Sequence, residues 1–482
     1  MFRRGLIGYL PANIVQGVVG LLTIMVFTRL LTPEQYGGYA LALSVMTLAH
    51  TTVFTWVEAA LARFQARAVE RGEVADHLAS LLRAFAVLAI VFPALAAVAV
   101  WLAPISPALK IAVGVGLAAI VFRSLIRIVQ ERRRADGEVM AASALDMGQT
   151  AGGFAIGVLA ITLGAGAAGP MIGLGAIAVI GLLFTLAKEL RLARGGHVQK
   201  ARLQDYASYG LPVAFSLILS LVISTTDRFL LAIFLDEQAV GVYHAGYSLA
   251  NRTLDVVFVW LGMAGGPAMV SALERGGRAA LAETAREQLS FMVLLTLPAA
   301  VGVALVAGPL AQLMIGEALS QGAADVTPWV AFGAFFSGLT TYYFHQAFTL
   351  GRRTHLLFVA MIIPAVANLV LNLILIPRFG IAGAMWSTAA SYSLGAVSSW
   401  LLGRRAMPLP VPLDVVWRAA VACAAMALVV LQLPAVGGIV ELALKAIIGG
   451  VVYGAVILLL DGGGLRSRGL GILQGLRTRA AT

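Results

Sequence analysis

The chain is poor in charged residues and contains no stretch typical of a water-soluble domain. Of its 482 residues, 12% are charged and 60% are hydrophobic, whereas soluble domains carry about twice that share of charge. A soluble protein of this composition could not cover its own surface with polar groups. The composition therefore excludes a water-soluble enzyme or binding module and indicates a chain that lies in a lipid bilayer.

Other shortages exclude several kinds of chemistry. The single cysteine, Cys423, lies in an apolar run, so a disulfide within the chain is impossible. No phosphate-binding Gly-x-x-x-x-Gly-Lys-Ser/Thr motif is present, so we expect no ATP hydrolysis by this chain. No His, Cys, Asp and Glu residues have metal-ligand spacing. We therefore expect no cofactor, no metal and no enzyme activity.

Long apolar runs without period-2 alternation predict membrane-spanning helices rather than a barrel. A span needs about 20 mainly apolar residues. By that length we expect an all-α polytopic membrane protein with about fourteen spans, at residues 7–29, 37–61, 78–103, 108–130, 139–162, 168–190, 206–235, 240–270, 283–306, 325–349, 354–376, 380–402, 413–432 and 438–460.

The Lys and Arg residues are distributed very unevenly between alternate loops. Loops on one side hold most of the 34 Lys and Arg residues, whereas loops on the other side hold only Arg29, Lys110 and Arg378. Cytoplasmic loops are enriched in Lys and Arg, so we expect both termini in the cytoplasm of a bacterium and the sparse side to face outward. This distribution also explains most of the net charge of +11, so nucleic-acid binding is not needed.

Two short patterns recur at an offset of 201 to 204 residues. Leu10-Pro11 matches Leu211-Pro212, and the outer loop around Glu34-Gln35 matches that around Glu237-Gln238. A repeat of six spans entering from the same side indicates a pseudo-twofold axis along the membrane normal, as in many secondary transporters. We therefore expect an N-terminal lobe at 1–203, a C-terminal lobe at 204–403, and two extra spans with a tail at 404–482.

Polar residues lie on one face of two repeat-equivalent spans. Ser44, Thr47, Thr51, Thr55 and Glu58 recur every three or four residues in one, and His244, Ser248, Asn251/Arg252 and Asp255 do so in the other. Intramembrane polar groups usually face a bundle interior or a cavity. The two stripes indicate either a shared central cavity or close interhelical packing through hydrogen bonds.

The charged residues within spans are the candidates for binding and coupling. Arg228 lies about 10 Å inside the outer end of its span and Arg252 about 18 Å inside its own. Each arginine binds an anionic headgroup, forms a buried pair with a neighbouring aspartate that fixes helix packing, or extends toward the membrane surface. The last alternative suits Arg228 better than Arg252. Candidate substrate-binding residues are Arg228, Arg252, Asn251 and His244. Candidate proton- or sodium-coupling residues are Asp255, Asp227, Asp146 and Glu58.

Arg123 and Arg127 end the span at 108–130 with i, i+4 spacing. They are either interfacial anchors or a patch where substrate enters.

Three segments resemble a known family. Thr28 to Gly37 is similar to the first outer loop of bacterial polysaccharide exporters. Asp227-Arg228-Phe229-Leu230-Leu231, followed by Val240 to Tyr243, and Asn368 to Ala384 are similar to their seventh, eighth and eleventh helices. The chain thus resembles the O-antigen/exopolysaccharide flippases of the multidrug/oligosaccharidyl-lipid/polysaccharide (MOP) exporter superfamily.

This resemblance implies a MATE/MOP-like fold with two six-helix lobes around a cavity that opens alternately to each side. It also implies a lipid-linked oligosaccharide substrate on undecaprenyl diphosphate, with Arg228 and Arg252 as cations in the cavity and a polysaccharide polymerase as a possible partner. Alternatives are a proton- or sodium-coupled multidrug antiporter of the same fold, a lipid II flippase, or a membrane scaffold without a transport path.

Overall fold

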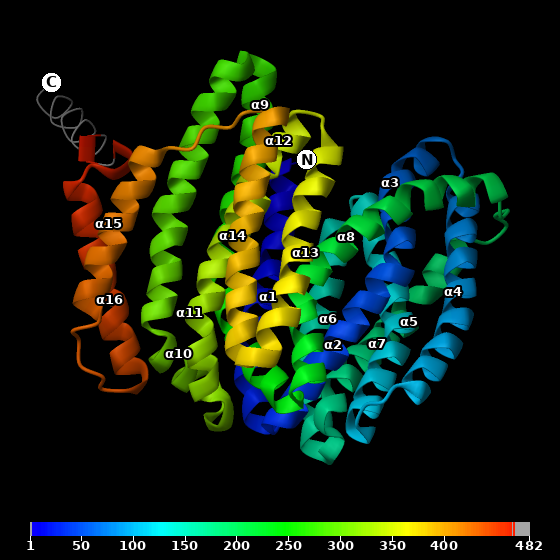
Figure 1. The fold of residues 1–482 in the computed structure, drawn as a ribbon. Helices are drawn as coiled ribbons and strands as arrows, with labels where there is room; N and C mark the ends of the chain where they lie inside the picture. The colour runs from blue at the N-terminus through cyan, green and yellow to red at the C-terminus, as the bar shows by residue number, and fades with distance from the viewer. Residues whose placement is uncertain (1, 465, 468–482) are drawn as a thin grey trace, which may run out of the picture. The chain divides into compact units, whose positions relative to one another are not determined.

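The computed structural model describes residues 2–464, 466 and 467, and the side chains of these residues from position 11 onward. In this part of the chain the secondary structure is helical, without strands. The chain divides into two compact units, residues 1–244 and 245–482. Figure 1 shows the helices of each unit.

The first unit consists of eight helices and the beginning of a ninth. A π-helical turn and a 3₁₀ turn, Ile161–Ala165 and Gly166–Ala168, connect α6 to α7. The helices are α1 (Phe2–Leu30), α2 (Pro33–Val53), α3 (Thr55–Glu70), α4 (Val74–Leu102), α5 (Pro107–Ala135), α6 (Val139–Ala160), α7 (Gly169–Leu192), α8 (Lys200–Phe234) and the start of α9 (Glu237–Leu305). Within this unit α5 packs against α2, α3 and α7, and α8 packs against α2 and α3.

The second unit holds the rest of α9 and the helices that follow it. These are α10 (Ala307–Met314), α11 (Glu317–Leu339), α12 (Gln346–Leu350), α13 (Thr354–Phe379), α14 (Ile381–Ala406), α15 (Leu413–Val430) and α16 (Gly438–Leu459). A π-helical stretch at Thr340–Phe344 links α11 to α12. Helix α14 packs against α11 and α13, and α15 and α16 pack against each other.

Two helical segments reverse direction at a glycine. In α9, Gly277 has φ 66° and ψ −155°, a conformation that only glycine adopts readily. In Figure 1 the green ribbon of α9 doubles back near its label. Gly164, with φ 92°, breaks the helix between α6 and α7. Residues 139–192 and 237–305 therefore each contain two of the expected spans.

Nine helical segments among the described residues are long and apolar enough to cross a membrane, or up to ten when the bent pair of α2 and α3 counts as one span. These include the two long segments with two expected spans each. Helices α11 and α14 also coincide with expected spans but are less apolar. The prediction of an all-α polytopic membrane protein is confirmed.

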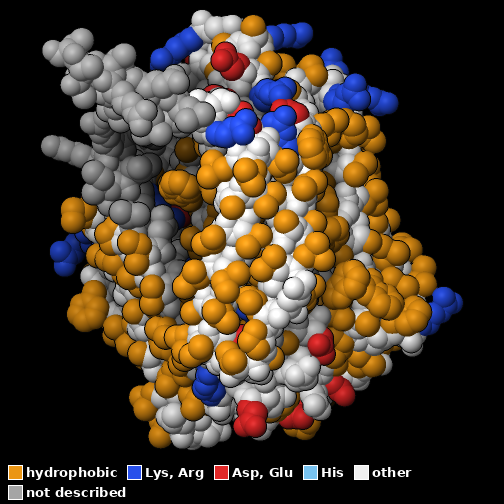
Figure 2. Space-filling model, turned by 90° about the vertical axis from the view of Figure 1, so that its left-hand side faces the viewer, with side chains coloured by type: hydrophobic (Ala, Val, Ile, Leu, Met, Phe, Trp, Pro, Cys, Tyr) orange, Lys and Arg blue, Asp and Glu red, His pale blue; other side chains and the backbone are white. Residues whose placement is uncertain are grey.

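The surface of the helices suits a bilayer. On the face seen in Figure 2, hydrophobic side chains cover a broad band, and Lys and Arg side chains gather beyond one edge of it. Helix α16 contributes large apolar side chains that are about two-thirds exposed, among them Val440, Ile447 and Val451. Because exposing so much contiguous apolar surface to water is unfavourable, this face is expected to contact lipid.

Candidate functional site

The carboxylate of Asp227 is fixed between α8 and the start of α9. Asp227 is fully buried and accepts a hydrogen bond of 2.6 Å from the hydroxyl group of Tyr243. A hydrogen bond to a charged acceptor is stronger than one between neutral groups. Asp227, a predicted coupling residue, is thus part of a link between two consecutive helices. Tyr243 was not among the predicted site residues, because its partner lies 16 positions away across a loop.

Arg228, the sequence neighbour of Asp227, is also buried, with 7% of its surface exposed. Its guanidinium group donates a hydrogen bond of 2.9 Å to the carbonyl oxygen of Ser224, one turn earlier on α8. The side chain therefore lies back along its own helix, as helical side chains generally do. This places a permanent positive charge inside a membrane-spanning helix.

His244 lies in an aromatic cluster with two tyrosines of α2. Its ring centroid is 5.5 Å from that of Tyr36 and 6.2 Å from that of Tyr39, and all three residues are buried. The imidazole of His244, a predicted substrate-binding residue, therefore contacts α2. Tyr36 and Tyr39 belong to the outer-loop motif that the sequence indicated, but their contact with His244 could not be read from it.

The beginnings of α2 and α9 touch through two glycines. A Cβ atom on Gly37 would lie 1.7 Å from the carbonyl oxygen of Glu237, and one on Gly241 would lie 2.4 Å from that of Pro33. Small residues allow helix backbones to approach this closely. Glu237 lies 204 residues after Pro33, and Gly241 lies 204 residues after Gly37. The contact is therefore reciprocal, because the glycine of each segment meets the equivalent position of the other segment. A reciprocal contact of this kind is characteristic of a local twofold axis.

Asn251, Arg252 and Asp255 belong to the second unit and form a separate group on α9. The amide of Asn251 donates a hydrogen bond of 3.1 Å to the carboxylate of Asp255. Arg252 and Asp255 are both exposed on the surface of α9 and interact electrostatically. These three predicted residues therefore come together, one turn apart, as the sequence spacing implied.

The other two predicted coupling residues have basic partners. One oxygen of Glu58 lies 2.8 Å from Nε2 of His50, across the 49° bend between α2 and α3. Asp146 on α6 forms an ion pair with Arg134 in the last turn of α5. His50 and Arg134 were not among the predicted site residues. The i, i+8 separation of His50 and Glu58 does not indicate a contact on a straight helix, and only the bend creates it.

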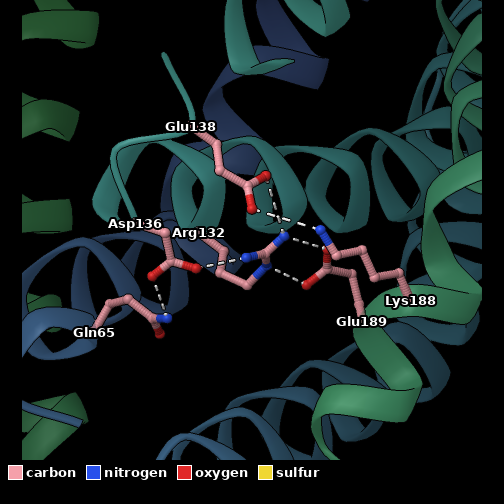
Figure 3. A network of polar contacts seen from close by, with 6 residues as sticks. All are labelled: Gln65, Arg132, Asp136, Glu138, Lys188 and Glu189. Atoms are coloured by element: carbon pink, nitrogen blue, oxygen red, sulfur yellow. Dashed lines mark hydrogen bonds and ion pairs between the residues drawn. The ribbon is translucent and has the colours of Figure 1, made fainter. Parts of the chain in front are cut away.

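A dense ionic network lies at the end of α5 (Figure 3). The guanidinium group of Arg132 contacts Glu189 of α7 through two hydrogen bonds, of 2.5 and 2.9 Å. It also donates a hydrogen bond of 2.5 Å to Asp136, which accepts another of 2.8 Å from Gln65 of α3. Arg132 is 2% exposed and Glu189 5%. The network therefore joins three helices of the first unit at one end of the bundle.

A cavity of about 350 Å³ lies in the second unit, among α9, α15 and the turn after α16. Its charged lining residues are Glu283, Arg286, Glu287 and Asp414, and Arg286 and Asp414 form an ion pair of 2.7 Å. None of the predicted site residues lines this cavity. It is therefore separate from the candidate site.

Comparisons with solved structures place the fold. Over 94% of this chain and 98% of the other, it is similar to the lipid II flippase MurJ in an inward closed conformation, with a TM-score of 0.77 and 13% sequence identity. It is also similar to an inward-facing multidrug resistance MATE family transporter of the MOP superfamily, with a TM-score of 0.65, 14% identity and coverage of 82% of this chain and 93% of that one.

A further similar structure is the Vibrio cholerae MATE transporter VcmN in the bent form, with a TM-score of 0.55, 17% identity and coverage of 84% of this chain and 96% of that one. Identities this low establish a shared fold, without a shared substrate. No curated protein sequence matches the chain significantly.

The family is established by sequence. Residues 2–273, more than half of the chain, match the family model described as polysaccharide biosynthesis protein. This range includes every predicted site residue, and the fold is similar to that of a MOP superfamily transporter. The resemblance predicted from the outer-loop and α8–α9 motifs is thereby confirmed. The chain belongs to the polysaccharide biosynthesis protein family and is a multi-pass membrane protein.

Proposed function

We propose that this transporter moves an undecaprenyl-diphosphate-linked oligosaccharide, an O-antigen or exopolysaccharide repeat unit, from the cytoplasmic to the periplasmic leaflet by alternating access. The observation that carries this proposal is the buried guanidinium group of Arg228 within a membrane-spanning helix of a chain from the polysaccharide biosynthesis protein family. Charged residues within membrane spans are rare and commonly mark substrate or ion pathways.

The chemistry of the proposed substrate matches this group. A guanidinium group stays charged at all physiological pH values and presents planar, paired donors to phosphate oxygens. In this proposal Arg228 and Arg252 bind the diphosphate, and Asn251 and His244 contact the adjoining sugar or phosphate. The coupling ion, a proton or sodium, binds at one of the carboxylates of Asp255, Asp227, Asp146 and Glu58.

Alternating access requires two halves that move relative to each other. The proposed halves are residues 1–203 and 204–403, with 404–482 outside the repeat. The reciprocal contact between Gly37 and Gly241 supports this duplication, because equivalent residues of the two motifs exchange roles in it. The Lys and Arg bias of the loops supports cytoplasmic termini and an inner-membrane location.

Substitution of the two arginines tests the proposal. We expect Arg228→Ala and Arg252→Ala each to reduce glycan export at least fivefold, because each removes a charge-assisted contact worth roughly 1.5–3 kcal/mol. The measurement is surface glycan in a deletion strain complemented with each variant, at equal amounts of membrane-inserted protein. Arg405→Ala, at an exposed position at the end of α14, is the matched control and should export normally.

Unchanged export in both arginine variants would contradict the phosphate-binding role. Accumulation of peptidoglycan precursors instead of glycan repeat units in the deletion strain would point to lipid II as the substrate. Drug sensitivity of that strain with normal glycan would point to an antiporter.

A further inference from the structure

The bend between α2 and α3 holds a paired carboxylate inside the first unit. Phe54 separates the two helices, which are inclined by 49°. His50 lies before the bend and Glu58 after it, and their side chains approach to 2.8 Å while only 13% and 10% exposed. The imidazole therefore fixes the position of the Glu58 carboxylate.

Two arginines of the neighbouring helix α5 lie at the depth of this bend. Helices α2 and α5 pack side by side, and two contacts give their register: Gly38 is level with Leu109, and Met46 is level with Gly116. Seven residues further along α5, the same register places Arg123 beside Phe54 at the bend.

Electrostatic contacts agree with this placement. Arg123 interacts electrostatically with Glu58, which follows the bend, and with Arg127 on its own helix. Because Arg123 and Arg127 are four positions apart, they lie on one face of α5, with Cβ atoms roughly 5–6 Å apart. The first unit thus contains two neighbouring positive charges and one nearby carboxylate.

These two arginines differ from the next arginines of α5 in their side-chain partners. In the part of the chain that the structure describes, the side chains of Arg123 and Arg127 form no hydrogen bond or ion pair. By contrast, Arg132 and Arg134 on the following turns are both paired with carboxylates. A role of Arg123 and Arg127 in fixing helix packing would require such partners.

We propose that Arg123 and Arg127 form a binding subsite for a diphosphate group, and that Glu58, held by His50, limits its affinity. The proposal rests on the proposed function and extends it to the first unit. Two guanidinium groups one turn apart match the two phosphoryl groups of a diphosphate, and each presents planar, paired donors. The Glu58 carboxylate lowers the positive potential at the subsite and so keeps a bound anion releasable.

Binding measurements on the purified full chain test the subsite. Native mass spectrometry with undecaprenyl diphosphate as the probe measures lipid binding, and competition with inorganic diphosphate measures free-anion binding. We expect Arg123→Gln and Arg127→Gln each to weaken lipid binding about tenfold, the loss of one charge-assisted contact of roughly 1.4 kcal/mol. Arg123→Lys should recover part of this loss.

The variant Glu58→Gln should bind undecaprenyl diphosphate about five- to tenfold more tightly, because it removes a negative charge near the two arginines. A merely structural role of Glu58 would not strengthen binding. Arg194→Gln, at an exposed position after α7, is the matched control and should bind like the wild type. Thermal unfolding of each variant shows whether it is folded.

The outcomes separate the two proposals. Wild-type binding that persists unchanged in folded Arg123→Gln and Arg127→Gln variants overturns the subsite and leaves the proposed function standing. Failure of the wild type to bind undecaprenyl diphosphate overturns the proposed function. If inorganic diphosphate nevertheless binds, and the variants rank in the same order of affinity for it, the subsite stands with a free anion as its occupant.

Discussion

Replacing Arg132 by alanine is expected to destabilise the first unit by about 3–5 kcal/mol, the range for removing one partner of a buried ion pair. Arg132 makes hydrogen bonds to Glu189 and Asp136 and is 2% exposed. Without it, the nearly buried carboxylate of Glu189 loses the partner that compensates it. Thermal unfolding of the purified protein, and the yield of folded protein, measure the effect.

A second variant keeps this prediction testable if Arg132→Ala does not fold. The double variant Arg132→Met, Glu189→Leu removes both charges, and apolar replacement of a buried pair is often neutral or stabilising. It should therefore recover most of the lost stability. The matched control is Arg286→Ala, whose pairing with Asp414 is about half exposed and should contribute at most about 1 kcal/mol. Equal losses from Arg132→Ala and Arg286→Ala would contradict the expected role of burial.

The helices were predictable because hydropathy reports directly on the length of apolar runs. The least distinct break, between the expected spans at 139–162 and 168–190, proved to be a turn at Gly164. By contrast, the bend at Phe54 and the short helix α10 were not predicted. The bend lies within a continuous run without Pro or Gly, so local sequence gives no signal for it.

The candidate site was predictable only in part. Intramembrane charge identified Asp227, Arg228 and Glu58, because charged residues inside spans are rare. Their partners were not predictable, since Tyr243 reaches Asp227 across a loop and His50 reaches Glu58 across a bend. The same limit applies to Arg123 and Arg127, which the sequence left open between anchors and a binding patch. Contacts between helices decide such cases, and a single sequence does not contain them.

Replacing Gly37 by leucine is expected to abolish glycan export, provided that the proposed transport cycle operates. A side chain at this position would overlap the carbonyl oxygen of Glu237, because even its Cβ atom would lie 1.7 Å away. The beginnings of α2 and α9 would have to separate by about 2 Å to reach ordinary contact distances of 3.5–4.0 Å. Both lie on the predicted outer side, so the variant cannot close that side before loading substrate from within.

Two measurements check this expectation. Export is measured in the complemented deletion strain, where Gly37→Leu should be inactive and Gly114→Leu, whose Cβ atom has no neighbour within 4 Å, should be active. Accessibility is measured with a membrane-impermeant thiol reagent on Tyr39→Cys in a Cys423→Ala background. Tyr39 is 7% exposed beside the contact, so labelling should rise when Gly37→Leu is added.

The reciprocal geometry adds a stricter requirement to this prediction. Because Gly241 meets Pro33 as Gly37 meets Glu237, Gly241→Leu should produce the same loss of export and the same rise in labelling. A chain in which Gly37→Leu exports normally and leaves position 39 protected would show that this contact stays closed throughout transport. The outer opening would then have to form elsewhere, and the repeated motif would serve only to hold α2 and α9 together.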